Sequence, residues 1–287
     1  MTEKELIKKV RFIELKSKKK TNSLFLGEYH TSFKGIGMTF SEVRQYQFGD
    51  DVRKIDWNKT ARFHEPFVKV FEEEREMISM LLVDISASMN FGTKKQFKNE
   101  LVAEICATLA FSAIKNNDKV GLVLYSDRID KFIPPKKGNS QVLTIIRTLL
   151  SAEPKPSETD MNVVLDFLLK TVKRKSAIFL ISDFDVNNFE RSLGIVAKKH
   201  NITGIRIYDE KERTFPDIGL AYLQDLETGK TQWVNTSSEN VQKKYTEYYR
   251  QLEILTENAF VKNGAGFLNI STADDYVKTL FNYFKAH

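Results

Sequence analysis

Short apolar runs alternate with longer amphipathic segments along most of the chain. Runs of buried-type residues between polar ones are typical of central strands in a parallel sheet, and a helical period is typical of the helices that connect them. The predicted strands are 78–83, 119–125, 129–133, 177–181, 202–208 and 267–270, with a hairpin over 220–234. The predicted helices are 96–116, 141–150, 161–173, 189–200, 239–260 and 274–285. This alternation predicts an α/β fold with a doubly wound, mainly parallel sheet flanked by helices.

The strand at 129–133 follows its predecessor after a short turn, so it is expected to lie antiparallel at the edge of the sheet. Pro134 and Pro135 are expected to end this strand, because proline has no backbone N–H to give to a ladder. Asn139 or Ser140 is expected to cap the helix that follows, since both residue types are favoured at helix N-termini.

The first 75 residues have a different pattern from the rest. Residues 3–16 have apolar positions at helical spacing, residues 24–33 indicate one or two short strands, and residues 66–74 alternate like a strand. Gly35 and Gly37 interrupt this region. We expect residues 1–75 to form an N-terminal helix and β extension packed on the core, and residues 76–287 to form the main domain.

The segment 40–62 mixes charged and aromatic residues without a helical or strand period. Such a segment is stable only if its charges pair and its aromatic rings cover the stems of the long side chains. Two interpretations stay open, a structural ion-pair clasp or a surface that binds a partner or substrate. The residues concerned are Arg44, Asp50, Asp51, Arg53, Asp56, Trp57 and Arg62, with Tyr46 as a second ring.

Oxygen-bearing side chains follow the predicted strands at the points where they end. Asp84, Ser86 and Ser88 come directly after the strand 78–83, and Asp183 follows the strand 177–181. Thr159 lies in the loop before the helix 161–173. Ligands of open α/β sheets gather at the carboxyl ends of the strands, so these five side chains are expected to surround one point. Oxygen donors suit a hard divalent cation such as Mg²⁺, with Mn²⁺ or Ca²⁺ as alternatives; in the other interpretation the Asp and Ser residues only form turns and caps.

Composition and charge limit the alternatives. The net charge of +6 permits an acidic partner or nucleic acid, but the charges are interspersed and no nucleic-acid-binding motif is present, so we expect no nucleic acid. The single cysteine, Cys106, lies in an apolar helical pattern and fits a reducing compartment. No apolar run is long enough for a membrane helix and the N-terminus does not read as a secretory signal, so we expect a soluble, cytoplasmic protein.

The oxygen cluster resembles the metal-ion-dependent adhesion site of von Willebrand factor A domains, in which an Asp-x-Ser-x-Ser loop, a Thr and an Asp hold the ion. Further motifs of the chain are Gly35-x-Gly37, 40–44, Arg44-x-Tyr46, Gly49-Asp50-Asp51-x-Arg53-x-Ile55-Asp56-Trp57, Ala61-Arg62, Asp84-x-Ser86-x-Ser88-Met89 and Pro134-Pro135-Lys136-Lys137-Gly138. These motifs are similar to those of the bacterial and archaeal family known as domain of unknown function 58. One departure is that Ser157-Glu158 precede Thr159, where family members often have glycines.

The resemblance implies a von Willebrand factor A-like domain whose metal ligands are Asp84, Ser86, Ser88, Thr159 and Asp183. It also implies a partner class, the MoxR-type AAA+ ATPases, and a role as an adaptor or co-chaperone in protein maturation or complex assembly. An ion held mainly by neutral hydroxyls keeps most of its charge, and would then favour a carboxylate from an unknown client protein as a further ligand.

We therefore expect a metal-dependent protein-interaction module and not an enzyme. No P-loop is present, so any ATP chemistry would belong to the partner. The alternative is a phosphohydrolase that uses Asp84 as its nucleophile. Such enzymes carry a second acid two residues further on, where this chain has Ser86, which cannot act as a general acid at neutral pH.

Overall fold

The computed structural model describes residues 11–13, 16–17, 39–72, 76–92, 97–153, 159–186, 188–214, 217–224 and 231–286. The chain divides into two units, one made of residues 1–29 and 78–287 and the other of residues 30–77. The strands predicted within 24–33 and the turn of the predicted hairpin lie outside the described residues. None of the described helices combines the length and apolar character that a membrane crossing requires.

A six-stranded sheet forms the centre of the larger unit. Its strands are β3 (Ile78–Asp84), β4 (Lys119–Tyr125), β5 (Ile129–Lys136), β6 (Ala177–Ser182), β7 (Asn201–Tyr208) and β10 (Gly266–Ser271). Their order is β10-β7-β6-β3-β4-β5, and only the β4–β5 pair within this sheet is antiparallel. The apolar run of β3 therefore lies in the middle of a mainly parallel sheet, which confirms the predicted fold class.

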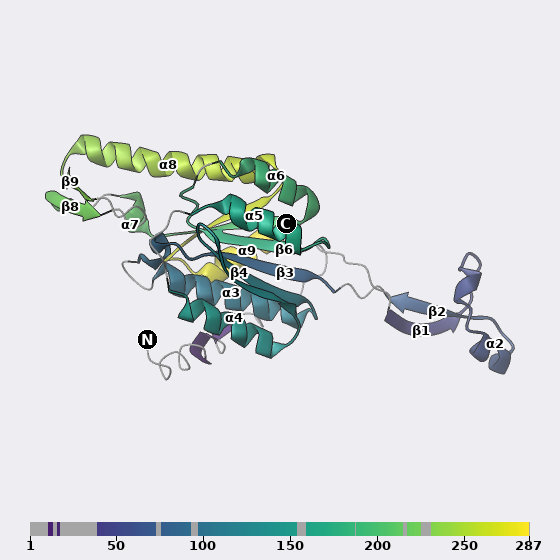
Figure 1. Ribbon diagram of the computed structural model, residues 1–287. Helices are drawn as coiled ribbons and strands as arrows, with labels where there is room; N and C mark the ends of the chain where they lie inside the picture. Colours follow the sequence, from purple (N-terminus) through teal and green to yellow (C-terminus); the bar gives the residue numbers. More distant parts are fainter. Residues whose placement is uncertain are drawn as a thin grey trace. The chain divides into compact units, whose positions relative to one another are not determined.

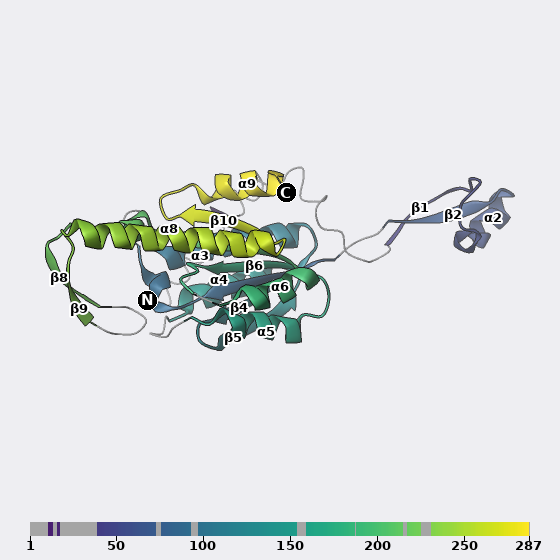
Figure 2. The same ribbon diagram turned by 90° about the horizontal axis from the view of Figure 1, so that it is seen from above.

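Helices cover both faces of this sheet (Figure 1, Figure 2). They are α3 (Lys98–Lys115), α4 (Asn139–Ser151), α5 (Met161–Thr171), α6 (Glu190–Lys199), α8 (Glu239–Lys262) and α9 (Tyr276–Ala286), with a single-turn α7 (Glu210–Arg213) after β7. Helices α5, α6 and α8 pack on the face that presents Met80 and Leu82, while Phe179 on the other face contacts Phe284 of α9. Strands β3 and β6 are buried on both faces and carry apolar residues on both.

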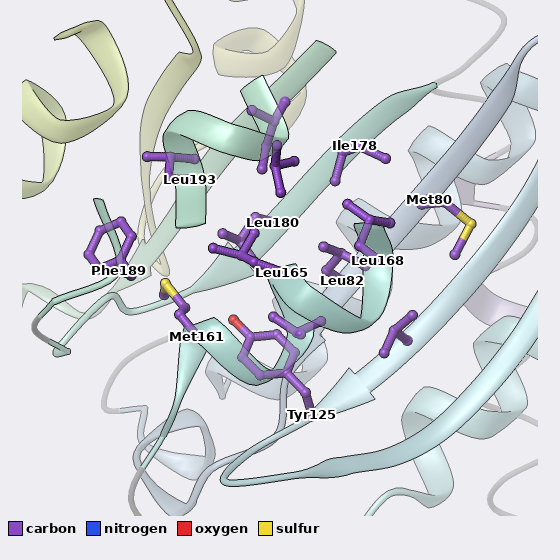
Figure 3. Packing of buried hydrophobic residues seen from close by; sticks show 14 of the residues in the cluster. Met80, Leu82, Tyr125, Met161, Leu165, Leu168, Ile178, Leu180, Phe189 and Leu193 are labelled. Atoms are coloured by element: carbon purple, nitrogen blue, oxygen red, sulfur yellow. The ribbon is translucent and has the colours of Figure 1, made fainter. Parts of the chain in front are cut away.

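Figure 3 shows the core on the α5 side of the sheet. Met161, Leu165 and Leu168 lie along one face of α5 and point toward Leu82 and its neighbours on β3 and β6. The spacing of these residues by three and four positions places them on one stripe of the helix. This stripe fixes the start of α5, and with it the loop that carries Thr159, close to the ends of the strands.

Two predictions next to the edge strand were wrong. Strand β5 continues through Pro134 and Pro135 to Lys136, because an edge strand tolerates residues that have no N–H and the register of β4 and β5 shifts at this point. Helix α4 begins at Asn139 with Gly138 as its N-cap, so neither Asn139 nor Ser140 is the cap. Gln141 instead joins α4 to the sheet by donating to the carbonyl oxygens of Val120 and Pro134.

The smaller unit contains regular elements that the sequence pattern did not reveal. Strands β1 (Thr39–Gln45) and β2 (Phe67–Glu72) pair antiparallel, and between them come the 3-10 helix η1 (Val52–Lys54) and helix α2 (Trp57–Phe63). The predicted strand at 66–74 is confirmed as β2. In the larger unit the predicted hairpin is confirmed as β8 (Leu220–Gln224) and β9 (Thr231–Asn235).

The predicted N-terminal helix is described only at 11–13 and 16–17, and these residues are helical. Ile13 is buried, and the Lys16 ammonium donates to both carboxylate oxygens of Glu104 on α3 at 2.6 Å. This part of the N-terminus therefore packs on α3 within the larger unit. The packing of the whole extension 1–75 on the core stays a prediction.

Candidate metal centre

Asp84 is the last residue of β3 and is almost completely buried. Its Oδ1 accepts a hydrogen bond from the Ser86 N–H at 2.8 Å, which turns the chain back over the strand end. The short 3-10 helix η2 (Ala87–Asn90) follows, and it holds the Ser86 and Ser88 hydroxyl oxygens 2.9 Å apart. The Asp-x-Ser-x-Ser spacing thus brings one carboxylate and two hydroxyls to the same side of the loop.

Thr159 reaches the same carboxylate from the loop before α5. Its hydroxyl lies 3.4 Å from each of the two Asp84 carboxylate oxygens. The loop is fixed on both sides, because the Asp160 N–H donates to the Ser126 carbonyl at the end of β4 and the Asp160 side chain caps α5. The position of Thr159 follows from the cap and from the neighbouring strand.

The end of β6 supplies the third side of the cluster. The Ser182 hydroxyl donates to Asp84 Oδ2 at 2.7 Å and accepts from the Phe184 N–H. Phe184 has a φ of 60°, a left-handed conformation that is costly for a large side chain. Its ring is fully buried against Phe260 and Phe267, so packing in the core holds the turn that presents Asp183.

The two carboxylates of the cluster differ in their electrostatic surroundings. Burial raises the pKa of Asp84 to about 6, and the nearby Asp183 carboxylate acts in the same direction. Burial also disfavours the charged form of Asp183, but the Lys98 ammonium and the Ser88 hydroxyl outweigh it and hold the pKa of Asp183 below its usual range. The partners of Asp84 are neutral, namely the Ser86 N–H and the hydroxyls of Ser182 and Thr159.

The structure brings together all five residues that were predicted to share one point, and it adds two that were not. The first is Ser182, whose hydroxyl donates to Asp84 Oδ2 at 2.7 Å. Lys98, at the start of α3, is completely buried and donates to Asp183 Oδ2 at 3.1 Å. A signal for Lys98 was present, since it lies three and four positions before the buried residues Leu101 and Val102 and so on the same face of the helix.

A family model described as "Protein of unknown function DUF58" matches residues 42–253, which include the whole cluster. The chain belongs to this family. An uncharacterized protein of Mycobacterium bovis, Mb1516, is 31% identical over 223 residues, which are 77% of this chain and 70% of that protein. An uncharacterized protein of Mycobacterium tuberculosis, Rv1480, matches with the same identity and the same shares of both chains.

Two solved structures are similar to this DUF58 protein at low sequence identity. BatB from Bacteroides thetaiotaomicron is 15% identical with a TM-score of 0.49, over 73% of this chain and 98% of BatB. The VWA domain of SpRpn10 is 11% identical with a TM-score of 0.42, over 72% of this chain and 94% of that domain. At these values the description of the fold rests on the strand order and the helices of the chain itself.

The donors of the cluster fit a small, hard cation. Carboxylate and hydroxyl oxygens are the ligands that Mg²⁺ prefers, and Asp84 is a buried carboxylate with which no lysine or arginine of the described part of the chain pairs. The described residues contain no group of three or more His, Cys, Asp or Glu side chains that could hold a metal. A site here therefore depends on the hydroxyls of Ser86, Ser88 and Thr159 together with its two aspartates.

The segment 40–62 of this DUF58 protein holds a separate set of charges in the smaller unit. Arg44 donates through Nη1 and Nη2 to the two carboxylate oxygens of Asp50, at 2.8 and 2.7 Å. The carboxylates of Asp51 and Asp56 accept instead from backbone N–H groups and cap η1 and α2. Trp57, which was predicted to pack against the arginine stems, has 70% of its surface exposed.

Proposed function

We propose that this DUF58 protein is a metal-dependent protein-interaction module. In this proposal Asp84, Ser86, Ser88, Thr159 and Asp183 hold a divalent cation, most simply Mg²⁺. When bound, the ion supplies an electrophilic position for an additional oxygen ligand from another molecule. The further ligand is a carboxylate on a client protein, and the implied assembly partner is a MoxR-type AAA+ ATPase.

The observation that supports the proposal most strongly is the environment of Asp84. A buried carboxylate is stable only when it is paired, hydrogen-bonded or protonated. Asp84 receives hydrogen bonds from neutral donors but stands beside a second carboxylate, so its charge is only partly compensated. A cation between the Asp84 loop and the Asp183 turn would remove this imbalance.

The types of donor favour docking over hydrolysis. Three of the five side chains are neutral hydroxyls, so they stabilise an ion without cancelling its charge. Ser86 stands where a phosphohydrolase of the alternative type would need a second acid, and it is hydrogen-bonded to Ser88. The residues of the cluster therefore suit the binding of an external carboxylate better than the transfer of a proton.

Calorimetric titration of chelator-treated protein with Mg²⁺ and Mn²⁺ tests the metal site. The wild type is expected to bind one ion, and Asp84→Asn is expected to abolish binding because it removes the charge at nearly constant size. Asp166→Asn, at an exposed position of α5, is the matched control and is expected to bind normally. Equal binding by wild type and Asp84→Asn would contradict the proposal.

A second experiment tests the interaction. The wild type, Asp84→Asn and Asp166→Asn are each immobilised and presented with the MoxR-type ATPase of the same organism in the presence of Mg²⁺ and ATP. A variant is used in place of a chelator, since the ATPase itself needs Mg²⁺. Loss of binding in Asp84→Asn alone is the expected result. Undiminished binding by Asp84→Asn, or phosphate-ester hydrolysis that this variant abolishes, would contradict an adaptor role.

A further inference from the structure

Lys98 has an unusual position for a lysine. Its side chain is completely buried, and its ammonium lies 3.1 Å from Asp183 Oδ2 and 2.6 Å from Glu212 Oε1. Lysine is almost never fully buried unless it is paired. Burial alone would lower the pKa of Lys98, but the carboxylates of Asp183 and Glu212 raise it above its ordinary value, so the ammonium is charged.

Glu212 is held in place independently of Lys98. Its second carboxylate oxygen accepts from the Asp209 N–H at 2.9 Å, and Asp209 in turn caps the start of α7. Asp209 Oδ2 also accepts from the Thr272 hydroxyl at 2.7 Å, which joins this cap to the end of β10. Glu212 is therefore a fixed acceptor that can retain the Lys98 ammonium whatever Asp183 does.

The same carboxylate of Asp183 thus serves two purposes. It belongs to the proposed metal site, through its closeness to Asp84 and its hydrogen bond from Ser88, and it is already paired with an internal cation. An ammonium held next to a carboxylate ligand lowers the negative charge available to a second cation. Because Lys98 is out of water, solvent and salt screen this effect only weakly.

We infer that Lys98 is a built-in counter-ion that competes with the divalent cation for Asp183 and so limits the affinity of the site. The inference rests on the proposed metal-binding function and deepens it. Lys98 acts on the ion through Asp183, as a positioning residue. Glu212 shares the Lys98 ammonium and so weakens its pairing with Asp183. The two residues are therefore expected to influence metal affinity in opposite directions.

Two substitutions test this arrangement by calorimetric titration of the full chain with Mn²⁺ and Mg²⁺. Lys98→Met keeps most of the side-chain volume but removes the charge, and it is expected to tighten binding by at least about tenfold, the usual size of a close charge effect. Glu212→Gln can still accept from the Asp209 N–H but holds the ammonium less strongly, so it is expected to weaken binding by about tenfold.

The matched controls carry the same charge changes on the exposed surface of α7. Lys211→Met and Glu210→Gln are both at exposed positions and are expected to leave the affinity within about twofold of the wild type. The difference between Lys98→Met and wild type is expected to persist in about 1 M NaCl, where the Debye length is only about 3 Å. Circular dichroism and thermal unfolding show whether each variant is folded.

The outcomes separate this inference from the proposed function. Tight binding by Lys98→Met supports the inference, even if the wild type binds too weakly to measure. Equal dissociation constants for wild type, Lys98→Met and Lys211→Met would overturn it and leave the metal site intact. Absence of binding in every variant would overturn the metal site and the inference with it. If Lys98→Met does not fold, Glu212→Gln decides, and an unchanged affinity in that variant overturns the inference.

Discussion

The carboxylates of Asp50 and Asp84 are both held by hydrogen bonds, but their negative charges are balanced in different ways. Asp50 receives two guanidinium N–H groups and the Gln47 N–H, and these interactions lower its pKa. Asp84 receives only neutral donors, lies beside a second carboxylate, and has its pKa raised to about 6. Among the described residues, the charge of Asp50 is paired with a cation of the chain and that of Asp84 is not.

In the proposed function, this difference separates a structural ion pair from a ligand-binding site. The bidentate Arg44–Asp50 pair needs nothing further and connects β1 to the turn that follows it. In the proposed function, a cation from outside the chain balances the charge of the Asp84 cluster. The four predictions that follow test this contrast, from the largest expected effect to the smallest.

The largest expected effect is on stability in the presence of metal. Saturating Mg²⁺ at about 100 times its Kd is expected to stabilise the wild type by about 2.7 kcal/mol, because the ion binds the folded state alone. Arg44→Ala is expected to gain as much, while Asp84→Asn gains nothing. Thermal unfolding with and without Mg²⁺ measures all three. An equal gain in Asp84→Asn would remove the distinction between the two sets of charges.

Ser182→Ala tests how much the neighbours of Asp84 contribute to metal affinity. The Ser182 hydroxyl holds Asp84 Oδ2, and loss of a group that orients a metal ligand typically costs roughly 10- to 100-fold in affinity. Calorimetric titration with Mn²⁺ measures the loss. Ser140→Ala, at an exposed position of α4, is the control and is expected to bind like the wild type. Normal affinity in Ser182→Ala would show that Asp84 needs no such support.

The contributions of Asp84 and Asp50 to the stability of the fold are expected to change with pH in opposite directions. The Asp84 carboxylate has a higher pKa in the folded protein than in the unfolded chain. The metal-free fold therefore loses stability as the pH rises from about 4 to about 6. Asp50 has a lowered pKa, so its contribution is present above its unfolded value and is lost as the pH falls through its folded value. Carboxyl NMR titration of wild type and Asp84→Asn identifies the upper transition. Its persistence in the variant would contradict the assignment.

The smallest expected effect belongs to the clasp. Arg44→Ala removes an ion pair at the surface, and such pairs contribute little to stability because water and salt screen them. A slight loss of thermal stability and an unchanged Mg²⁺ affinity are expected. A large loss of either would mean that the clasp and the metal centre depend on each other.

Much of the larger unit could be predicted because its strands are short apolar runs between polar boundaries. The strand-end rule then placed Asp84, Ser86, Ser88 and Asp183 at one edge of the sheet without knowledge of the strand order. Thr159 could also be predicted to lie near this point, because its loop precedes a helix with a clear apolar stripe.

The contact between Lys98 and Asp183 could not be predicted. Lys98 is 85 residues from Asp183, and no local pattern indicates that one buried charge meets the other. The helices of the smaller unit could not be predicted for a different reason. Its helix α2 has no buried residues, so no apolar period marks it, and Asp51 and Asp56 cap helices in place of pairing with arginines.

The most direct test of the metal centre is a crystal structure of the protein grown with Mn²⁺, with X-ray data that locate the ion by its anomalous scattering. The account predicts a single strong peak within coordination distance of the Ser86 and Ser88 hydroxyls, between Asp84 and Asp183, and no peak at Arg44 and Asp50. A well-ordered crystal with saturating Mn²⁺ and no peak at the Asp84 cluster would contradict it.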